Sequence, residues 1–240
     1  MKQLIDAIFS EKRVVVITGA GISTLSGIPD FRGNNGLYTK DDNVEYMLSK
    51  SCLIEEPDRF YEFYKKNILV DNIKPNIIHD TLTKLERLGY IEGIITQNID
   101  NLHEKSGSKN VVDLHGNGER FYCKKCNKKV SIEDYKKNYK CLCGGVIRPD
   151  IVLYDEFVKS VDHSKSLEMI HNADYLVILG SSLLVNTVGR LIDAFIRKNG
   201  YDNNIFIVNN KETPYDYCAK RYEEDLGIVL KKINNEIDKR

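Results

Sequence analysis

Tryptophan is absent from this sequence of 240 residues, methionine occurs only three times, and no long apolar run is present. The longest apolar stretches fall far short of the roughly 20 residues that a membrane-spanning helix needs, so we expect no membrane partner. The sequence also lacks an excess of either charge, because 35 Lys and Arg residues balance 35 Asp and Glu residues. No global charge indicates a nucleic-acid partner, and we expect none, although a local basic patch is compatible with this balance.

A secretory signal is missing as well. Residues 1–8 combine apolar side chains with Asp6, and no small-residue cleavage pattern follows, which favours an amphipathic helix. We therefore expect a cytoplasmic protein. Six cysteines are present, four of them within residues 123–143. Without a secretory signal, clustered cysteines indicate metal binding before disulfides.

Short β-branched runs alternate with helical patterns along most of the chain. The first run, Arg13–Thr18, ends in a glycine turn, and similar runs follow at Ile91–Thr96, Tyr175–Leu179 and Asn204–Val208. Between them, Ile77–Leu88 repeats its apolar residues at helix spacing. Strands that alternate with helices predict a parallel α/β sheet.

Two segments interrupt this alternation. Residues 34–74 are rich in Tyr, Phe and charged side chains, and residues 117–150 are rich in Lys and contain the four clustered cysteines. We interpret both as insertions that pack together into a second, smaller lobe. The main lobe then comprises residues 1–33, 75–116 and 151–240.

A glycine turn follows the first predicted strand. The run Gly19-Ala20-Gly21 lets the backbone turn tightly and approach a phosphate, whose charge free helix N–H groups can meet. Thr24 stands where the usual dinucleotide fingerprint has its third glycine. Taken alone, the motif is therefore equally compatible with a plain strand-to-helix turn.

The loop after this turn carries three chemically different side chains. Asp30, Phe31 and Arg32 offer a carboxylate, an aromatic ring and a fixed cation between Gly27 and Gly33. A loop bracketed by glycines suits a mobile cover over a charged cofactor. It favours the phosphate-binding interpretation of the preceding turn.

Polar residues follow the strand predicted at Ile91–Ile95. The segment Thr96–Asp100 lies at its carboxyl end, where α/β folds place their ligands. Gln97 and Asn98 can hydrogen-bond an amide or a ribose, and Asp100 can accept from a carboxamide or stabilise a developing cation. The alternative is that Asn98 or Asp100 caps the next helix.

One of the five histidines follows an apolar stretch. Val111–Leu114 leads to His115, and Gly116 leaves the imidazole accessible. A histidine at the carboxyl end of a strand suits a general base, because its pKa is close to the working pH. His103 falls in a predicted helix, and a purely structural role is the alternative for His115.

The cysteine cluster consists of two closely spaced pairs, Cys123 with Cys126 and Cys141 with Cys143. Four thiolates can close a tetrahedral shell around zinc, although the Cys-x-Cys pair is one residue shorter than the usual knuckle. A closed shell leaves no position for water, so we predict a structural rather than a catalytic zinc. Free or redox-active thiols are the alternative.

Two further predicted strands end in small or polar residues. Gly180-Ser181-Ser182 follows Leu176–Leu179, and Asn209 follows Ile205–Val208. Both could contact the phosphates and the adenosine ribose of a dinucleotide. The alternative is that the serines only cap the next helix.

Together these motifs resemble those of the sirtuin family along nearly the whole chain. The carriers of the resemblance are Gly19–Ser23, Asp30–Gly33, Thr96–Asp100, His115-Gly116, the four cysteines, Arg148-Pro149, Gly180–Ser182 and Val208-Asn209. The resemblance implies a Rossmann-like NAD-binding lobe, a smaller lobe of zinc ribbon plus helical module, and an acyl-lysine peptide between them. It implies an NAD-dependent protein-lysine deacetylase that releases nicotinamide and transfers the acyl group to ADP-ribose.

The resemblance also assigns roles to single residues. His115 would be the general base on the ribose hydroxyls, and Asn98 would act beside it in the nicotinamide pocket. The implied cofactor-binding residues are Gly19, Ala20, Gly21, Thr24, Asp30, Phe31, Arg32, Gln97, Asn98, Ile99, Asp100, Gly180, Ser181, Ser182, Asn209 and Leu226. The implied zinc ligands are Cys123, Cys126, Cys141 and Cys143, and the implied substrate contacts are Val152, Leu153, Asp155 and Val185.

The sequence departs from the family pattern in three places. One is the shortened Cys-x-Cys pair. At the second, Tyr154-Asp155-Glu156 replaces Phe-Gly-Glu, so that Asp155 stands where a glycine neighbours the bound peptide. At the third, Leu183–Val188 lacks a frequent proline. We expect the last two to affect peptide affinity and sequence preference more than catalysis.

Residues 63–67 bear on the acyl group. Sirtuins that remove acidic acyl groups resemble one another in a Tyr-x-x-Arg pair that binds the distal carboxylate, whereas this sequence has Tyr64 and Asn67. A buried carboxylate without its cation loses charge-assisted hydrogen bonds worth roughly 1.5–3 kcal/mol each. We therefore expect acetyl to be preferred over succinyl or malonyl.

Two other functions are compatible with the motifs. An NAD-dependent ADP-ribosyltransferase would use the same glycosidic cleavage with a protein nucleophile as the acceptor. A non-catalytic NAD or ADP-ribose binding module would use the cysteine lobe to dock a partner. His115 favours an enzyme over the binding module, because a sensor needs no base at that position.

Overall fold

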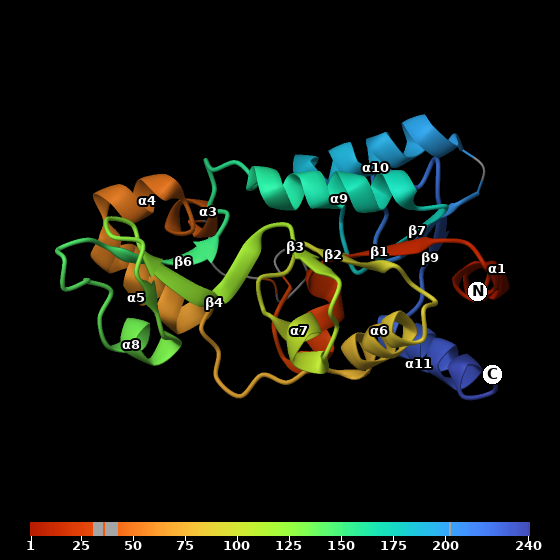
Figure 1. The fold of residues 1–240 in the computed structure, drawn as a ribbon, viewed down its shortest axis with the longest axis horizontal. Helices are drawn as coiled ribbons and strands as arrows, with labels where there is room; N and C mark the ends of the chain where they lie inside the picture. Colours follow the sequence, from red (N-terminus) through yellow and green to blue (C-terminus); the bar gives the residue numbers. More distant parts are fainter. Residues whose placement is uncertain (31–35, 37–42, 202) are drawn as a thin grey trace.

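The computed structural model of this protein describes residues 1–30, 36, 43–201 and 203–240. A six-stranded sheet with its helices occupies one end of the molecule, and a three-stranded sheet with further helices occupies the other (Figure 1). Both chain termini lie at the end of the large sheet that is farthest from the small one.

All neighbouring strands of the large sheet run parallel, in the order β3-β2-β1-β7-β8-β9. The chain passes from β1 to β2 and β3 on one side, and later from β7 to β8 and β9 on the other. The order therefore reverses between β1 and β7, the topological switch point where open α/β sheets bind ligands. The strands are β1 (Val14–Thr18), β2 (Gly93–Thr96), β3 (Val111–Asp113), β7 (Tyr175–Leu179), β8 (Ile205–Val208) and β9 (Lys220–Tyr222).

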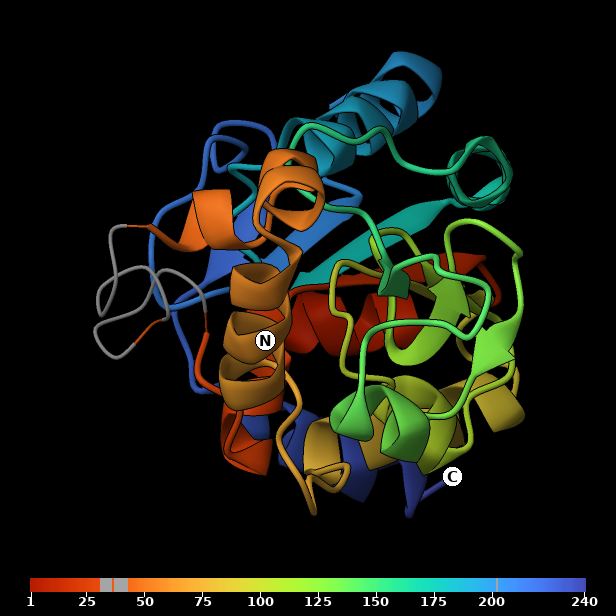
Figure 2. The ribbon, with the colours of Figure 1, turned by 90° about the vertical axis from the view of Figure 1, so that its left-hand side faces the viewer.

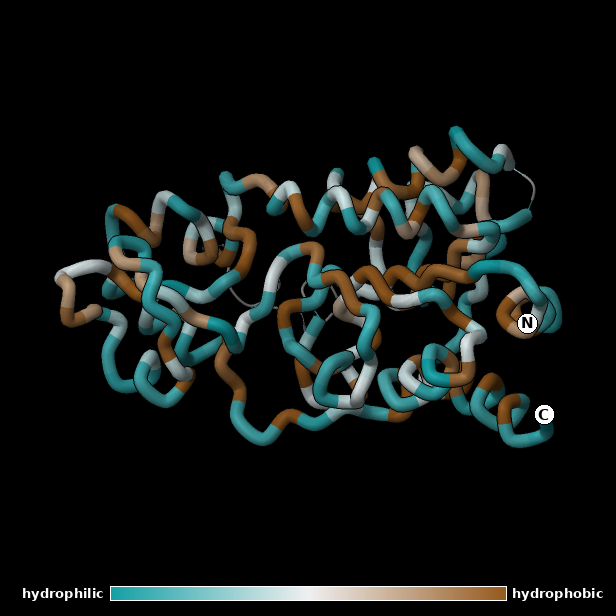
Figure 3. Tube along the Cα trace, viewed as in Figure 1, coloured by the Kyte–Doolittle hydropathy of each residue, from teal (hydrophilic) through white to brown (hydrophobic). Residues whose placement is uncertain are grey.

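Both faces of the large sheet are covered by helices, which explains why its strands are continuous apolar runs. Val14 and Val16 pack with α1, α6 and α11, whereas Val15 and Ile17 pack with α9 and α10. Figure 3 shows the hydrophobic colour concentrated along these central strands. The elements of this lobe are α1 (Lys2–Ile8), the 3₁₀ helix η1 (Ala20–Ser26), α6 (Ile77–Arg87), α7 (Leu102–Ser106), α9 (Ser160–Asn172), α10 (Asn186–Asn199) and α11 (Leu226–Ile237).

The small sheet is antiparallel, in the order β5-β4-β6. Its core is aromatic: the ring of Phe121 stacks on that of Tyr135 with centroids 4.2 Å apart, and Tyr64 packs edge-on against both. Figure 2 views the molecule from this side, with the helices and the small sheet next to each other. The elements of this smaller lobe are α3 (Val44–Met47), α4 (Lys50–Glu55), α5 (Pro57–Asn67), β4 (Gly116–Cys123), β5 (Lys129–Val130), α8 (Ile132–Lys137) and β6 (Ile147–Ile151).

The parallel α/β sheet predicted from the sequence is confirmed, with a strand at each of the four predicted runs. The predicted helix at Ile77–Leu88 corresponds to α6, and the amphipathic N-terminus corresponds to α1. Strand β9 was not predicted, because Lys220–Tyr222 is short and polar. Among the described residues, no helix has the length and apolar character that crossing a membrane requires.

Candidate active site

The switch point is built from two glycine turns that contact each other. Gly19 and Gly21 follow β1, and the N–H of Gly21 donates to the carbonyl of Gly180, which follows β7. A Cβ atom built on Gly19 would lie 2.7 Å from the Gly180 oxygen, and one built on Gly21 would lie 2.8 Å from the Cα atom of Gly180. The glycines are therefore required for the packing of these two turns, in addition to any approach to a phosphate.

A polar network joins the ends of β1, β2 and β7. Gln97 Nε2 donates to Ser181 Oγ at 2.7 Å, which ties β2 to the turn after β7. Asn98 is 7% exposed and donates from Nδ2 to Gly19 O and to Ser23 Oγ, both at 3.2 Å. These bonds fix the amide planes of both side chains at the edge of the sheet, where a ligand would lie.

Asp100 has a different environment from the other residues of its motif. Its Oδ2 accepts from Ser23 Oγ at 2.6 Å, and its Oδ1 accepts from the N–H of Leu102 at the start of α7. Asp100 is not among the residues that line the cavity described below. In this geometry it fixes Ser23 and accepts from the first N–H of α7, whose N-cap residue is Asn101 and not Asn98 or Asp100.

His115 follows β3 and belongs to the same strand edge. Its Nδ1 lies 3.0 Å from the backbone oxygen of Gln97 and its Nε2 lies 3.4 Å from Thr187 Oγ1. A carbonyl oxygen only accepts, so Nδ1 carries the hydrogen and Nε2 of the neutral ring keeps its lone pair. Burial lowers the pKa of His115, and the bond to Gln97 opposes this shift. The imidazole is therefore kept neutral, as a base requires.

One cavity of about 610 Å³ brings most of the predicted residues together. Its volume falls within the range of roughly 300–1,000 Å³ that small-molecule sites occupy. The predicted residues in its lining are Gly19, Ala20, Gly21, Thr24, Asp30, Gln97, Asn98, Ile99, His115, Val152, Leu153, Asp155, Gly180, Ser181, Ser182, Val185, Asn209 and Leu226. Phe31 and Arg32 lie outside the described residues.

Several lining residues were missed from the sequence. Thr187, on the first turn of α10, gave no signal because a lone threonine is common there. Phe157 and Leu184 are exposed apolar side chains without periodicity. Asp225 could have been found as the N-cap of α11. The lining residues that were missed are Leu25, Leu48, Ile78, Ile151, Tyr154, Glu156, Phe157, Val158, Leu184, Thr187, Asn210, Lys211, Asp225 and Gly227.

The cavity fits a dinucleotide in its chemistry. Uncharged donors and acceptors from Gln97, Asn98 and Asn209 line it, together with serines at the switch point. The backbone of Gly19 and Gly21 forms part of its wall, so a phosphate can approach the main chain there. Val152, Leu153 and Val185 add an apolar part to the same lining.

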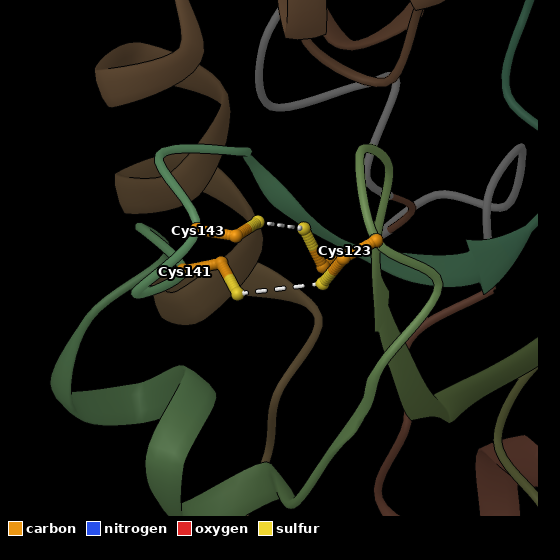
Figure 4. A group of neighbouring side chains, drawn as sticks. Cys123, Cys141 and Cys143 are labelled. Carbon is orange, nitrogen blue, oxygen red and sulfur yellow. Dashed lines mark hydrogen bonds between the residues drawn. The ribbon is translucent and has the colours of Figure 1, made fainter.

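The four clustered cysteines lie in the small lobe, away from this cavity. The Sγ atoms of Cys123 and Cys143 are 3.5 Å apart, those of Cys126 and Cys141 are 3.8 Å apart, and all four lie within 4.8 Å of one another (Figure 4). A tetrahedral zinc with Zn–S bonds of about 2.3 Å separates its sulfurs by about 3.8 Å, whereas a disulfide needs about 2.05 Å. The shortened Cys-x-Cys pair therefore still fits a closed zinc shell.

Tyr64 and Asn67, which we related to the acyl group, do not line the cavity. Tyr64 is fully buried and its hydroxyl donates to Gly118 O at 3.1 Å. Asn67 Nδ2 donates to Phe63 O, one turn earlier on α5. These two residues therefore do not form a pocket for the distal end of an acyl group in this structure.

The comparisons with known proteins agree with the site. A profile of the Sir2 family matches residues 19–187. A protein of Listeria monocytogenes named NAD-dependent protein deacetylase is 42% identical over 234 residues, covering 97% of this chain and 100% of that protein. A protein of Staphylococcus aureus with the same name is 42% identical over 244 residues, covering 98% of this chain and 97% of its own length.

Solved structures of Sir2 proteins also match this chain over nearly its whole length. The complex named Sir2-p53 peptide-NAD⁺ superimposes with a TM-score of 0.89 and 36% identity, covering 100% of this chain and 99% of that one. Sir2 with the inhibitor EX-527, 2′-O-acetyl-ADP-ribose and deacetylated p53 peptide superimposes with a TM-score of 0.88 and 36% identity, covering 99% of both chains. The sirtuin resemblance recognised in the sequence is confirmed, and the chain belongs to the Sir2 family.

Proposed function

We propose that this chain is an NAD-dependent protein-lysine deacetylase that transfers the acetyl group to ADP-ribose and releases nicotinamide. The observation that carries this function is the placement of His115, a neutral base in the lining of a cavity that combines polar and apolar side chains. The relatives named NAD-dependent protein deacetylase cover nearly the whole chain and support the assignment. The co-substrates are NAD and an acetylated lysine on a protein.

Residues at the carboxyl edge of the large sheet carry out the proton transfer and hydrogen-bond the co-substrate. NAD supplies the glycosidic bond that is cleaved and the ADP-ribose that accepts the acetyl group. His115 takes a proton from a ribose hydroxyl at Nε2, the atom that its bond to Gln97 leaves unprotonated. Asn98 and Gln97, held by Gly19 and Ser181, hydrogen-bond the nicotinamide and ribose. Since burial lowers the pKa of His115, activity should decline on the acid side below the ordinary histidine value of about 6.5.

The two lobes have separate tasks in this proposal. Residues 1–33, 75–116 and 151–240 form the NAD-binding lobe, and residues 34–74 and 117–150 form the small lobe. The cysteine shell is closed by four thiolates from the protein, so zinc stabilises the small lobe and supplies no open coordination position. The acetyl-lysine peptide binds between the lobes, along Val152, Leu153 and Val185.

The preferred acyl group is neutral, with acetyl before succinyl. Among the described residues that line the cavity, the only lysine or arginine is Lys211. It follows β8, whereas His115 follows β3, and three strands lie between them. An acidic acyl group beside His115 would therefore lack a cationic partner from the described lining. Comparing kcat/KM for acetyl-lysine and succinyl-lysine in one peptide tests this preference, and equal values would refute it.

Incubation with NAD and an acetyl-lysine peptide tests the function itself. Nicotinamide release together with the loss of the acetyl mass from the peptide is the expected result. A gain of the ADP-ribose mass on a protein acceptor would instead identify an ADP-ribosyltransferase. NAD binding without nicotinamide release would identify a binding module.

A further inference from the structure

The segment after β6 forms one wall of the cavity and is held at three points. The N–H of Tyr154 donates to Leu48 O, and the N–H of Lys50 donates to Tyr154 O, both at 3.0 Å. Arg148, 4% exposed in its side chain, pairs with Glu156 through two hydrogen bonds of 2.6 and 2.9 Å. The second oxygen of Glu156 also accepts from the N–H of Leu153. The loop is therefore fixed from both sides.

Asp155 occupies a special backbone position within this fixed loop. The N–H of Glu156 donates to Leu153 O at 3.0 Å, which closes a tight turn, and Asp155 adopts φ +67° inside it. A positive φ favours glycine, the residue that the resembling family has here, although Asp tolerates the left-handed region better than most residues. The main-chain geometry is thus that of a glycine turn, and the Asp adds a carboxylate to it.

This carboxylate is exposed, lines the cavity and has no hydrogen bond or ion pair with any other residue that the structure describes. The neighbouring charges are already matched: Glu156 is paired with Arg148, and Lys159 with Asp150 at 2.6 Å. Leu184, Val185 and Thr187, which line the same cavity, carry no charge. One unmatched negative charge therefore stands at this side of the cavity.

Aromatic surface accompanies the charge. Phe157 is 97% exposed and Tyr154 is 38% exposed, and both line the same cavity. A lysine or arginine side chain can lay its methylene stem, or its guanidinium plane, on such a ring while its cationic head reaches a carboxylate. A carboxylate beside exposed rings suits a long basic side chain better than an acidic or a small one.

We propose that Asp155 makes this enzyme prefer acetyl-lysines that have lysine or arginine within two residues on either side. The inference rests on the proposed deacetylase function, because it names the sequence class of the protein substrate. An exposed ion pair changes kcat/KM by about twofold to fivefold. Salt should weaken the preference, since exposed charges are screened at about 0.5 M ionic strength.

The test compares acetyl-lysine peptides that differ only in carrying Lys or Glu at each of the flanking positions. Wild type should favour the Lys peptide at one of these positions, and Asp155→Asn, which keeps the tolerance for positive φ, should make the kcat/KM values of the Lys and Glu peptides equal. Glu133→Gln is the matched control, because it removes an exposed charge on α8 outside the cavity. An Asp155→Asn variant with the wild-type preference, or a wild type without one, would overturn the proposal.

Binding of the same peptides to the wild type, measured by fluorescence anisotropy, separates this proposal from the proposed function. Tighter binding of the Lys peptide that is lost in Asp155→Asn, without deacetylation of either peptide, would contradict the function but support the peptide preference. Deacetylation of both peptides at equal rates and with equal affinities would support the function and contradict the preference.

Discussion

The large and small lobes are stabilised in different ways. Six parallel strands bury aliphatic side chains on both faces of the large sheet, and Val15, Ile17 and Ile178 are 0% exposed. The small lobe has three antiparallel strands, a core that contains stacked Phe and Tyr rings, and two pairs of thiols. The large lobe can rely on aliphatic burial, whereas we expect the small lobe to need a metal in addition to its core.

This difference explains where the chemistry lies. The residues to which we assign the reaction stand on the edge of the large sheet, where neighbouring strands hold Asn98 and His115 in fixed positions. The loop after β6, which leads from the small sheet back to the large lobe, lines the same cavity. The residues that we assign to catalysis are thus on the rigid lobe, and those that we assign to peptide choice lie where the lobes meet.

Loss of zinc should produce the largest difference in thermal stability between the two lobes. Cys141→Ser breaks the closed shell, and structural zinc sites contribute about 10–16 kcal/mol of binding free energy that is coupled to folding. We expect loss of zinc and a separate, lower melting transition for the aromatic small lobe, followed by near-UV circular dichroism and metal analysis. Cys218→Ala, a buried cysteine outside the cluster, is the control. Unchanged melting after complete chelation would show that zinc does not hold the small lobe.

Breaking the Arg148–Glu156 pair should destabilise the loop between the lobes to a smaller extent. Arg148→Met leaves the partly buried Glu156 carboxylate without its cation, which costs about 3–5 kcal/mol when a buried pair loses one partner. Because Glu156 is 21% exposed in its side chain, we expect the lower end of this range. Urea unfolding measures it, and the double variant with Glu156→Leu should recover part of the loss. An Arg148→Met variant with the wild-type free energy of unfolding would contradict the assigned role of the pair.

Acid should destabilise the large lobe through a buried histidine. Burial lowers the pKa of His103 to about 3, below its unfolded value of about 6.5. As the pH is lowered, the unfolded chain therefore binds a proton before the folded chain does. The free energy of unfolding falls by up to about 1.4 kcal/mol for each pH unit between these two pKa values. His103→Gln should flatten this slope in urea titrations from pH 7 to pH 5. An unchanged slope would mean that His103 is not responsible.

Thr187 should contribute the smallest effect. Its hydroxyl lies 3.4 Å from Nε2 of His115 and steadies the orientation of the ring. A single neutral hydrogen bond is worth about 1 kcal/mol, so Thr187→Val should lower kcat about fivefold and leave NAD affinity unchanged. Thr187→Ser keeps the hydroxyl and should restore most of the rate. A slow Thr187→Ser variant together with a normal Thr187→Val variant would show that the methyl group and not the hydroxyl matters.

The sequence predicted the parts of the molecule that local patterns encode. Val14–Thr18 and Ile205–Val208 are continuous β-branched runs, so their burial in a parallel sheet was predictable. Polar residues directly after such runs were correctly expected at a common edge, and the spacing of the cysteines predicted their clustering. For the strands and the polar residues after them, the signal lies within a few residues of the feature that it predicts.

Features that depend on contacts between distant segments could not be read in this way. Thr187 approaches His115 only because α10 begins beside the end of β3, and Arg148 meets Glu156 only because the loop after β6 turns back. Tyr64 was placed near the acyl group, but the packing of α5 directs its hydroxyl to Gly118. Pairings and side-chain directions of this kind arise from tertiary packing, and one sequence alone does not specify them.

The most direct test of the division between a catalytic and a structural lobe is the turnover of His115→Ala with NAD and an acetyl-lysine peptide. This variant should retain zinc, its wild-type melting temperature and most of its NAD affinity, and lose deacetylation by at least roughly 10²-fold, because a general base contributes about that much. Deacetylation at a near-normal rate by a folded, zinc-loaded His115→Ala protein would contradict the account.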